Sequence, residues 1–203
     1  MEQRQEIIEK AFEQFKQFGF KNVTMDDLSR SLGISKKTLY EIFTDKDELV
    51  MESVKYMLTS NQEKTQEAFQ QSKNAIEQII RILVLMENMI RGMNLICYFD
   101  LQRHYSAAYK YLQQHKETFL KECITSNLKQ GIREGYYRED IDIEVMARFR
   151  MESSMLVFQN NLFPSNDYDI VRVNTQIFAH YMYGIATLKG HKMITNQLQK
   201  RNR

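Results

Sequence analysis

Five neighbouring residues carry hydroxyl and ammonium groups that suit the binding of phosphates and base edges. They lie in the stretch GISKKTLYEIF and are Ser35, Lys36, Lys37, Thr38 and Tyr40. Lysines neutralise phosphates or reach guanine edges, and the hydroxyls of Ser, Thr and Tyr bond to phosphate oxygens. A lysine pair on a short helix is more often only a solvated face, so the elements that position these groups decide between the two interpretations.

Two short helices joined by a tight turn would position this group. Thr24 can begin the first helix, with Asp27 completing a capping box, and Gly33 ends it. Ser35 can cap the second helix. A short helix, a glycine turn and another short helix form a helix-turn-helix, whose second helix enters the major groove of DNA.

Another cation, Lys46, lies in the first turn of a helix that Asp45 and Glu48 are expected to cap. A cation there opposes the helix dipole, so an external phosphate would explain its placement. Residues 1–50 contain eight Lys or Arg and ten Asp or Glu, a net charge of −2, whereas DNA-binding modules are usually basic. The cations nevertheless gather at the expected contact edge, and a local basic patch is compatible with that total.

Residues 4–50 resemble the amino-terminal domain of the tetracycline-repressor (TetR) family of one-component bacterial transcription regulators. The likeness lies in a Phe-rich first helix that ends in FGF, followed by VTMDDLSRSLGIS, KKTLYEIF and DKDELV. The resemblance implies that the third helix reads the groove of a double-stranded DNA operator. It also implies contacts to bases or to the DNA backbone from Thr24, Lys36, Lys37, Thr38, Tyr40 and Lys46. Ser35 is added to the predicted DNA contacts because its hydroxyl can bond to a phosphate oxygen.

The rest of the chain is expected to be helical as well. One proline and seven glycines in 203 residues leave little room for a sheet, and an apolar content of 43% supports a packed core. We expect a DNA-binding domain over residues 1–50 and a larger domain over 51–203, connected by the helix that begins near residue 46. No secretory signal or membrane-spanning run occurs, so we expect a cytoplasmic protein in which Cys97 and Cys123 are reduced thiols.

Two late helices, expected over about residues 142–162 and 169–188, are apolar on more than one face. Such helices must be buried on two sides, which suits either a four-helix dimer interface or a thick core within one chain. The family resemblance favours a homodimer. The interface residues predicted on this basis are Phe149, Met155, Phe158, Ile177, Phe178, Tyr181, Met182 and Ile185.

Methionines and aromatic residues gather on the helices in between. Thioether and aromatic walls form adaptable apolar pockets, although such a stripe is more often plain core. The resemblance to ligand-responsive repressors favours a site for a largely apolar small molecule. The predicted lining is Met86, Met89, Met93, Tyr98, Phe99, His104 and Tyr105.

Catalysis has little support in the sequence. No nucleophile elbow, P-loop or dinucleotide fingerprint occurs, and none of the four histidines has a Glu three residues before it, as a di-iron site requires. Asp100 and His104 could share a metal but more often form a local hydrogen-bonded pair. A helical adaptor that binds only protein, or a helical enzyme, would leave the clustered lysines unexplained. The sequence therefore predicts an all-α, ligand-responsive repressor without cofactor or metal.

Overall fold

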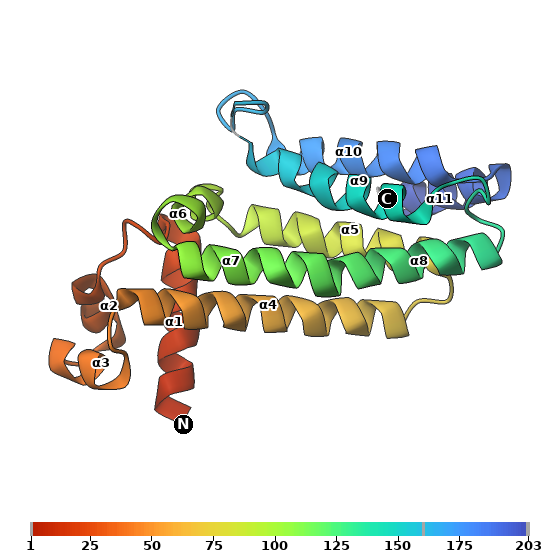
Figure 1. Ribbon diagram of the computed structural model, residues 1–203. Coiled ribbons are helices and arrows are strands. Elements are labelled where there is room, and N and C mark those ends of the chain that lie inside the picture. The colour runs from red at the N-terminus through yellow and green to blue at the C-terminus, as the bar shows by residue number, and fades with distance from the viewer. Residues whose placement is uncertain (1, 160, 202–203) are drawn as a thin grey trace. The chain divides into compact units, whose positions relative to one another are not determined.

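The computed structural model describes residues 2–159 and 161–201, and within these ranges the chain consists of helices joined by turns and loops (Figure 1). An isolated bridge between Tyr137 and Ala186 is the sole β pairing of the described residues. The helices are α1 Glu2–Phe18, α2 Met25–Leu32, α3 Lys36–Ile42, α4 Lys46–Gln70, α5 Ala75–Arg91, α6 Ile96–His104, α7 Ser106–His115, α8 Lys121–Arg133, α9 Ile143–Met155, α10 Ile170–Ile185 and α11 Leu188–Arg201, with a π-helical segment at Lys116–Leu120 and a 3-10 segment at Leu156–Phe158. The predicted all-α fold is confirmed.

The chain divides into two compact units. Unit 1 comprises residues 2–62 and 92–115, and unit 2 comprises residues 63–91 and 116–201. Helix α4 passes from unit 1 into unit 2, so the boundary predicted at residue 50 falls inside a continuous helix. Helices α6 and α7 join the amino-terminal helices in unit 1, an association that the sequence pattern does not indicate.

The core of unit 1 forms because the apolar residues of α1 recur at helical spacing and meet those of α2 to α4. Ile8 and Phe15 lie on one face of α1, and both are buried. Leu28 on α2 and Leu39 on α3 have no exposed surface, and they pack in the same cluster. Helices too short to be stable alone are therefore held by burial of their apolar faces.

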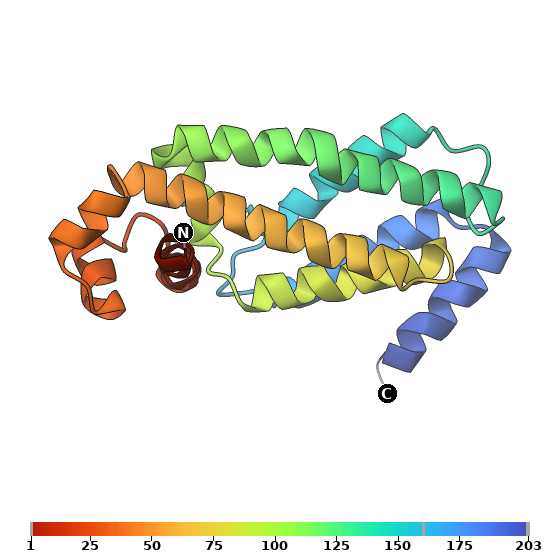
Figure 2. The ribbon, with the colours of Figure 1, turned by 90° about the horizontal axis from the view of Figure 1, so that it is seen from below.

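Unit 2 is built around α5, which packs against α8, α10 and α11, while α9 packs between α8 and α10. Helix α11 turns back after α10 (Figure 2). The core includes the fully buried side chains of Ile76, Leu83, Leu128 and Met182. These apolar contacts give unit 2 a core of its own.

Several helix ends differ from the sequence expectation. The helix predicted to run through Leu162 ends at Met155 and continues as one 3-10 turn. The helix predicted to run to about residue 188 stops at Ile185, and the following Gly190 lies inside α11. A Cβ at Gly190 would lie 2.1 Å from the carbonyl oxygen of Tyr136, so this glycine permits close backbone approach instead of ending a helix.

Basic residues near the carboxyl terminus belong to the last helix. The structure continues α11 to Arg201, whose Nη2 donates to a carboxylate oxygen of Glu87 at 2.9 Å. Asn202 and Arg203 lie outside the described residues. None of the described helices is both long enough and apolar enough to cross a membrane.

Candidate nucleic-acid interface

Helix α2 begins with the predicted capping box. The Thr24 hydroxyl accepts from the backbone N–H of Asp27 at 3.1 Å, and the Asp27 carboxylate accepts from the backbone N–H of Thr24 at 3.0 Å. The Thr24 hydroxyl also donates to this carboxylate, and these bonds lower the pKa of Asp27. Thr24 is exposed, but its side chain already serves the helix.

The turn between α2 and α3 depends on Gly33. Its φ of 67° lies in the left-handed region, where glycine is favoured. The next residue, Ile34, donates its N–H to the carbonyl of Ser29 at 3.1 Å, which closes the end of α2. Ser35 then caps α3 by accepting from the backbone N–H of Thr38 at 3.0 Å. The helix-turn-helix arrangement predicted from these residues is confirmed.

Helix α3 has one buried face and one outer face. Leu39 is fully buried, whereas the side chain of Lys37 is 87% exposed and Tyr40 is 45% exposed. The ammonium of Lys37 lies 3.8 Å from the carboxylate of Glu41, a loose contact that leaves it accessible. The ammonium of Lys37 and the phenol of Tyr40 are therefore exposed on α3, while the opposite face of this helix is held by the buried Leu39.

Lys36 has a partner that the sequence does not reveal. Its ammonium lies 2.7 Å from the carboxylate of Asp26 on α2. The hydrogen bond from Lys36 and the charge of Asp26 raise the pKa of this lysine. An acidic group thus lies at the edge that was expected to meet phosphate.

Lys46 is half-buried and is engaged within unit 1. Its Nζ donates to the carbonyl oxygen of Lys21 at 3.1 Å and lies 5.6 Å from the ring centroid of Tyr105. Burial lowers the pKa of Lys46. The structure therefore brings Ser35, Lys36, Lys37, Thr38 and Tyr40 together on one short segment, while Thr24 and Lys46 lie at the starts of α2 and α4.

The residues predicted to line a ligand pocket are divided between the units. Met86 and Met89 belong to unit 2, and the others belong to unit 1. Tyr98 contacts the ring of Phe99 edge-on, with the centroids 6.1 Å apart. Met93 is partly buried and packs against the core of unit 1. The pocket assignment stays a prediction.

Two further residues of that set differ in exposure. The Tyr105 hydroxyl donates to the carbonyl oxygen of Phe20 at 3.2 Å, and the residue is buried in the core of unit 1. His104 is exposed.

Asp100 accepts from the backbone N–H of Lys21. No group of three or more metal-binding side chains occurs within residues 2–159 and 161–201.

The residues predicted for the dimer interface differ in exposure and fall into three classes. Phe158, Phe178, Tyr181, Met182 and Ile185 are buried within their own chain, and Met155 and Ile177 are half-buried. Phe149 is 48% exposed, and Val145, one turn earlier on α9, is 54% exposed. If α9 meets a partner, these two side chains offer apolar surface; the interface itself stays a prediction.

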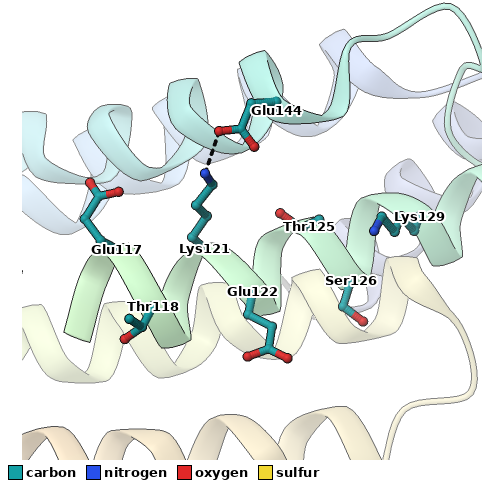
Figure 3. A pocket seen from close by; sticks show the side chains of 8 residues that line it. All are labelled: Glu117, Thr118, Lys121, Glu122, Thr125, Ser126, Lys129 and Glu144. Atoms are coloured by element: carbon teal, nitrogen blue, oxygen red, sulfur yellow. Dashed lines mark hydrogen bonds and ion pairs between the residues drawn. The ribbon is translucent and has the colours of Figure 1, made fainter. Parts of the chain in front are cut away.

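A polar hollow lies on unit 2 beside α8 and α9 (Figure 3). Its lining consists of Glu117, Thr118, Lys121, Glu122, Thr125, Ser126, Lys129 and Glu144. Lys121 spans it to bind Glu144, with the two atoms 2.5 Å apart. Such a lining lacks the apolar walls expected for the predicted ligand site.

Comparison with known proteins supports the DNA-binding assignment. Residues 7–52 match the sequence model described as "Bacterial regulatory proteins, tetR family". The HTH-type transcriptional repressor KstR2 of Mycobacterium tuberculosis is 25% identical over 150 residues, which cover 72% of this chain and 74% of that protein. Residues 7–52, which match the family model, contain α2, the turn and α3.

Solved structures support the fold over most of the chain. The structure of the ketosteroid transcriptional regulator KstR2 of M. tuberculosis has a TM-score of 0.65 at 24% identity, covering 91% of this chain and 95% of that one. A putative transcriptional regulator of Saccharomonospora viridis, crystallised with choline, has a TM-score of 0.77 at 15% identity, with coverage of 92% and 98%. Residues 7–52 match the tetracycline-repressor family, and the amino-terminal helices form a helix-turn-helix DNA-binding domain of a transcriptional regulator.

Proposed function

We propose that this regulator is a homodimeric repressor that binds a near-palindromic operator in the cytoplasm and changes its DNA affinity when a small molecule binds. The observation that carries the proposal is the outer edge of α3. Lys37 and Tyr40 are exposed there, while Leu39 on the opposite face is fully buried. A helix fixed in this way can enter a major groove without rearranging its own core.

The phosphate backbone would supply most of the affinity. Each lysine that neutralises a phosphate releases counterions, so binding weakens as salt rises. Lys37 needs only to leave a loose contact with Glu41, whereas Lys36 must exchange Asp26 for phosphate. We therefore assign Lys37 the larger electrostatic share and Lys36 a smaller one.

A two-fold dimer would explain the exposed apolar residues of α9. Phe149 and Val145 lie one turn apart on the same side of this helix. A dimer would place two copies of α3 on half-sites separated by about one DNA turn, roughly 34 to 36 Å. The operator is then expected to be close to palindromic.

A ligand response is supported by resemblance and by the contacts of α6. KstR2 of M. tuberculosis is named a transcriptional repressor, and the S. viridis regulator was crystallised with choline. In this chain, the N–H of Asn94 donates to the carbonyl oxygen of Lys16 at 2.8 Å, just before α6 begins. Movement of α6 would therefore reach the end of α1 directly.

Fluorescence anisotropy with labelled DNA from upstream of the protein's own gene tests the proposal. The full chain should bind this DNA more tightly than a scrambled duplex of equal length, and Lys37→Ala should bind weakly. Lys192→Ala removes an exposed lysine from α11 and serves as the matched control. Equal binding of both duplexes, or equal loss in the two variants, would contradict the proposed interface.

A further inference from the structure

Arg150 is a buried cation in the core of unit 2. It lies on α9 and is 5% exposed. Its guanidinium carbon lies 4.1 Å from the ring centroid of Phe178 and 5.7 Å from that of Tyr181, both on α10. Burial lowers the pKa of Arg150 to about 10, so the group is still charged at neutral pH. The rings offset only part of the cost of removing this charge from water.

Among the described residues, no carboxylate compensates this charge. Nη2 of Arg150 donates to the thioether sulfur of Met86 at 3.1 Å, a weak acceptor. Nη1 is buried and has no partner within residues 2–159 and 161–201, and no ion pair of Arg150 occurs there. Buried guanidinium groups normally bind carboxylates through both nitrogens.

Two carboxylates, one on α5 and one on α9 itself, already bind other cations. Glu87, the residue after Met86 on α5, accepts from Arg201 at 2.9 Å. Glu152 on α9 accepts from Lys116 at 2.7 Å. The fold therefore supplies acidic partners to other cations nearby and none to Arg150.

Asn127 shows how unit 2 satisfies a buried polar side chain, in contrast to the open donor of Arg150. The side-chain amide of Asn127 donates to the carbonyl of Ala75 and to Gln78, both at 2.9 Å, and its oxygen accepts from Tyr137 at 3.1 Å. Native cores leave few such groups without partners, because each costs free energy. Nη1 of Arg150 is one of only four buried polar side-chain atoms without a partner among the described residues, so it requires an explanation.

A second open donor occurs on the adjoining helix. The side-chain nitrogen of Asn174 on α10 is buried and has no partner among the described residues. Asn174 lies one helical turn before Phe178, so both residues face the same side of α10. Three methionines, Met86, Met146 and Met182, belong to the surrounding apolar cluster, and flexible thioethers can repack around an inserted molecule.

We propose that Arg150 binds the carboxylate of an amphipathic small molecule whose apolar body occupies the methionine and aromatic cluster between α5, α9 and α10. The inference rests on the proposed function, since it names the chemical class of the ligand. A carboxylate fits the planar guanidinium fork, and its single charge costs less to desolvate than a dianionic phosphate. This assignment adds an anionic group to the largely apolar ligand expected from the sequence.

The test measures ligand binding to the full chain without DNA, by isothermal titration calorimetry. The probes are octanoate, 4-phenylbutyrate and cholate, each compared with a neutral counterpart: 1-octanol, 4-phenyl-1-butanol and the methyl ester of cholic acid. At least one carboxylate should bind the natural chain tenfold or more tightly than its counterpart. Arg150→Met should reduce this preference to less than twofold.

Arg148→Gln is the matched control, because Arg148 is exposed on the same helix; it should keep the full preference. Arg150→Gln gives the same comparison should Arg150→Met prove unfolded. Equal affinity for every carboxylate and its counterpart, or a preference that persists without Arg150, would overturn the assignment. Carboxylate binding that leaves DNA affinity unchanged would instead contradict the proposed ligand response and leave the site intact.

Discussion

The carboxylate of Asp100 on α6 accepts a hydrogen bond from the backbone N–H of Lys21 at 2.9 Å. Asp100 is only 6% exposed, and Lys21 lies in the connection between α1 and α2. This bond ties a helix from the middle of the sequence to the connection that leads into the helix-turn-helix. Residues 79 positions apart thereby become parts of one structural unit.

Asp100→Ala is expected to lower the free energy of unfolding by about 1.5 to 3 kcal/mol, the range for hydrogen bonds to charged groups. The loss arises because the N–H of Lys21 keeps no equivalent acceptor in a partly buried position. Urea denaturation followed by circular dichroism measures it. Arg103→Ala, at an exposed position of the same helix, should change stability little. An equal loss of stability in both variants would show that the bond between Asp100 and Lys21 does not cause the loss.

Lys37→Ala should reduce the salt dependence of DNA binding. If Lys37 neutralises one phosphate in each half-site, the slope of log affinity against log salt should fall by about one unit per half-site. Anisotropy titrations at several salt concentrations give this slope. An unchanged slope would place Lys37 away from phosphate, even if affinity itself decreased.

Asp26→Asn should strengthen DNA binding. The substitution removes a negative charge from the contact edge and releases the ammonium of Lys36, which lies 2.7 Å from that carboxylate. We expect roughly a two- to fivefold gain at low salt that disappears at high salt, because exposed charges are screened. The double variant Asp26→Asn with Lys36→Ala should lose most of the gain; a gain that survives would mean that the aspartate alone opposes DNA.

The helix starts were predictable because capping chemistry is local. Thr24 and Ser35 cap helices with side-chain oxygens, as predicted, and Asp142 and Asp169 do the same at the starts of α9 and α10. The arrangement of the helix-turn-helix followed from these caps and from Gly33. These features depend on neighbours within a few residues, which a sequence displays directly.

The remaining features depend on residues that are distant in the sequence. Lys36 pairs with Asp26 across the turn, and Lys46 bonds to the carbonyl of Lys21. The residue type of Arg150 suggests a solvent-exposed side chain. In the structure, however, Phe178 and Tyr181 of α10 cover its guanidinium group. The residues predicted for one ligand pocket are divided between two units, because helical periodicity shows which face is apolar but not which helix covers it.

Stability should fall with rising pH through the buried thiol of Cys97. This thiol donates to the carbonyl of Phe15 at 3.2 Å, and burial raises its pKa from 9.0 to about 12. Between these values the unfolded chain loses a proton that the folded chain keeps, so the contribution is complete below pH 9 and decreases as pH rises. It should amount to about 1.4 kcal/mol lost at pH 10, one unit above the unfolded pKa.

Cys97→Ala isolates this contribution from that of the other titrating groups. The difference in unfolding free energy between pH 8 and pH 10, measured in urea, should be smaller in the variant than in the natural chain. The native protein at pH 8 should also react slowly with a thiol reagent at both Cys97 and Cys123, since both thiols are free and their pKa values are raised. Fast reaction at Cys97 in the folded state would contradict the burial on which the pH effect depends.

Phe149→Glu should dissociate the proposed homodimer. Phe149 is 48% exposed, so a charge there leaves the core intact while it opposes burial of the α9 surface against a partner. The buried Phe178 cannot serve this purpose, because a charge at a position with 1% exposure would damage the fold itself. Sedimentation velocity should show a dimer for the natural chain and a monomer for Phe149→Glu, with unchanged circular dichroism. Gln176→Glu, an exposed polar position on α10, is the control and should remain dimeric. If Phe149→Glu remains dimeric, the interface lies on another surface. If the natural chain is monomeric, the proposed dimer and its near-palindromic operator are both wrong.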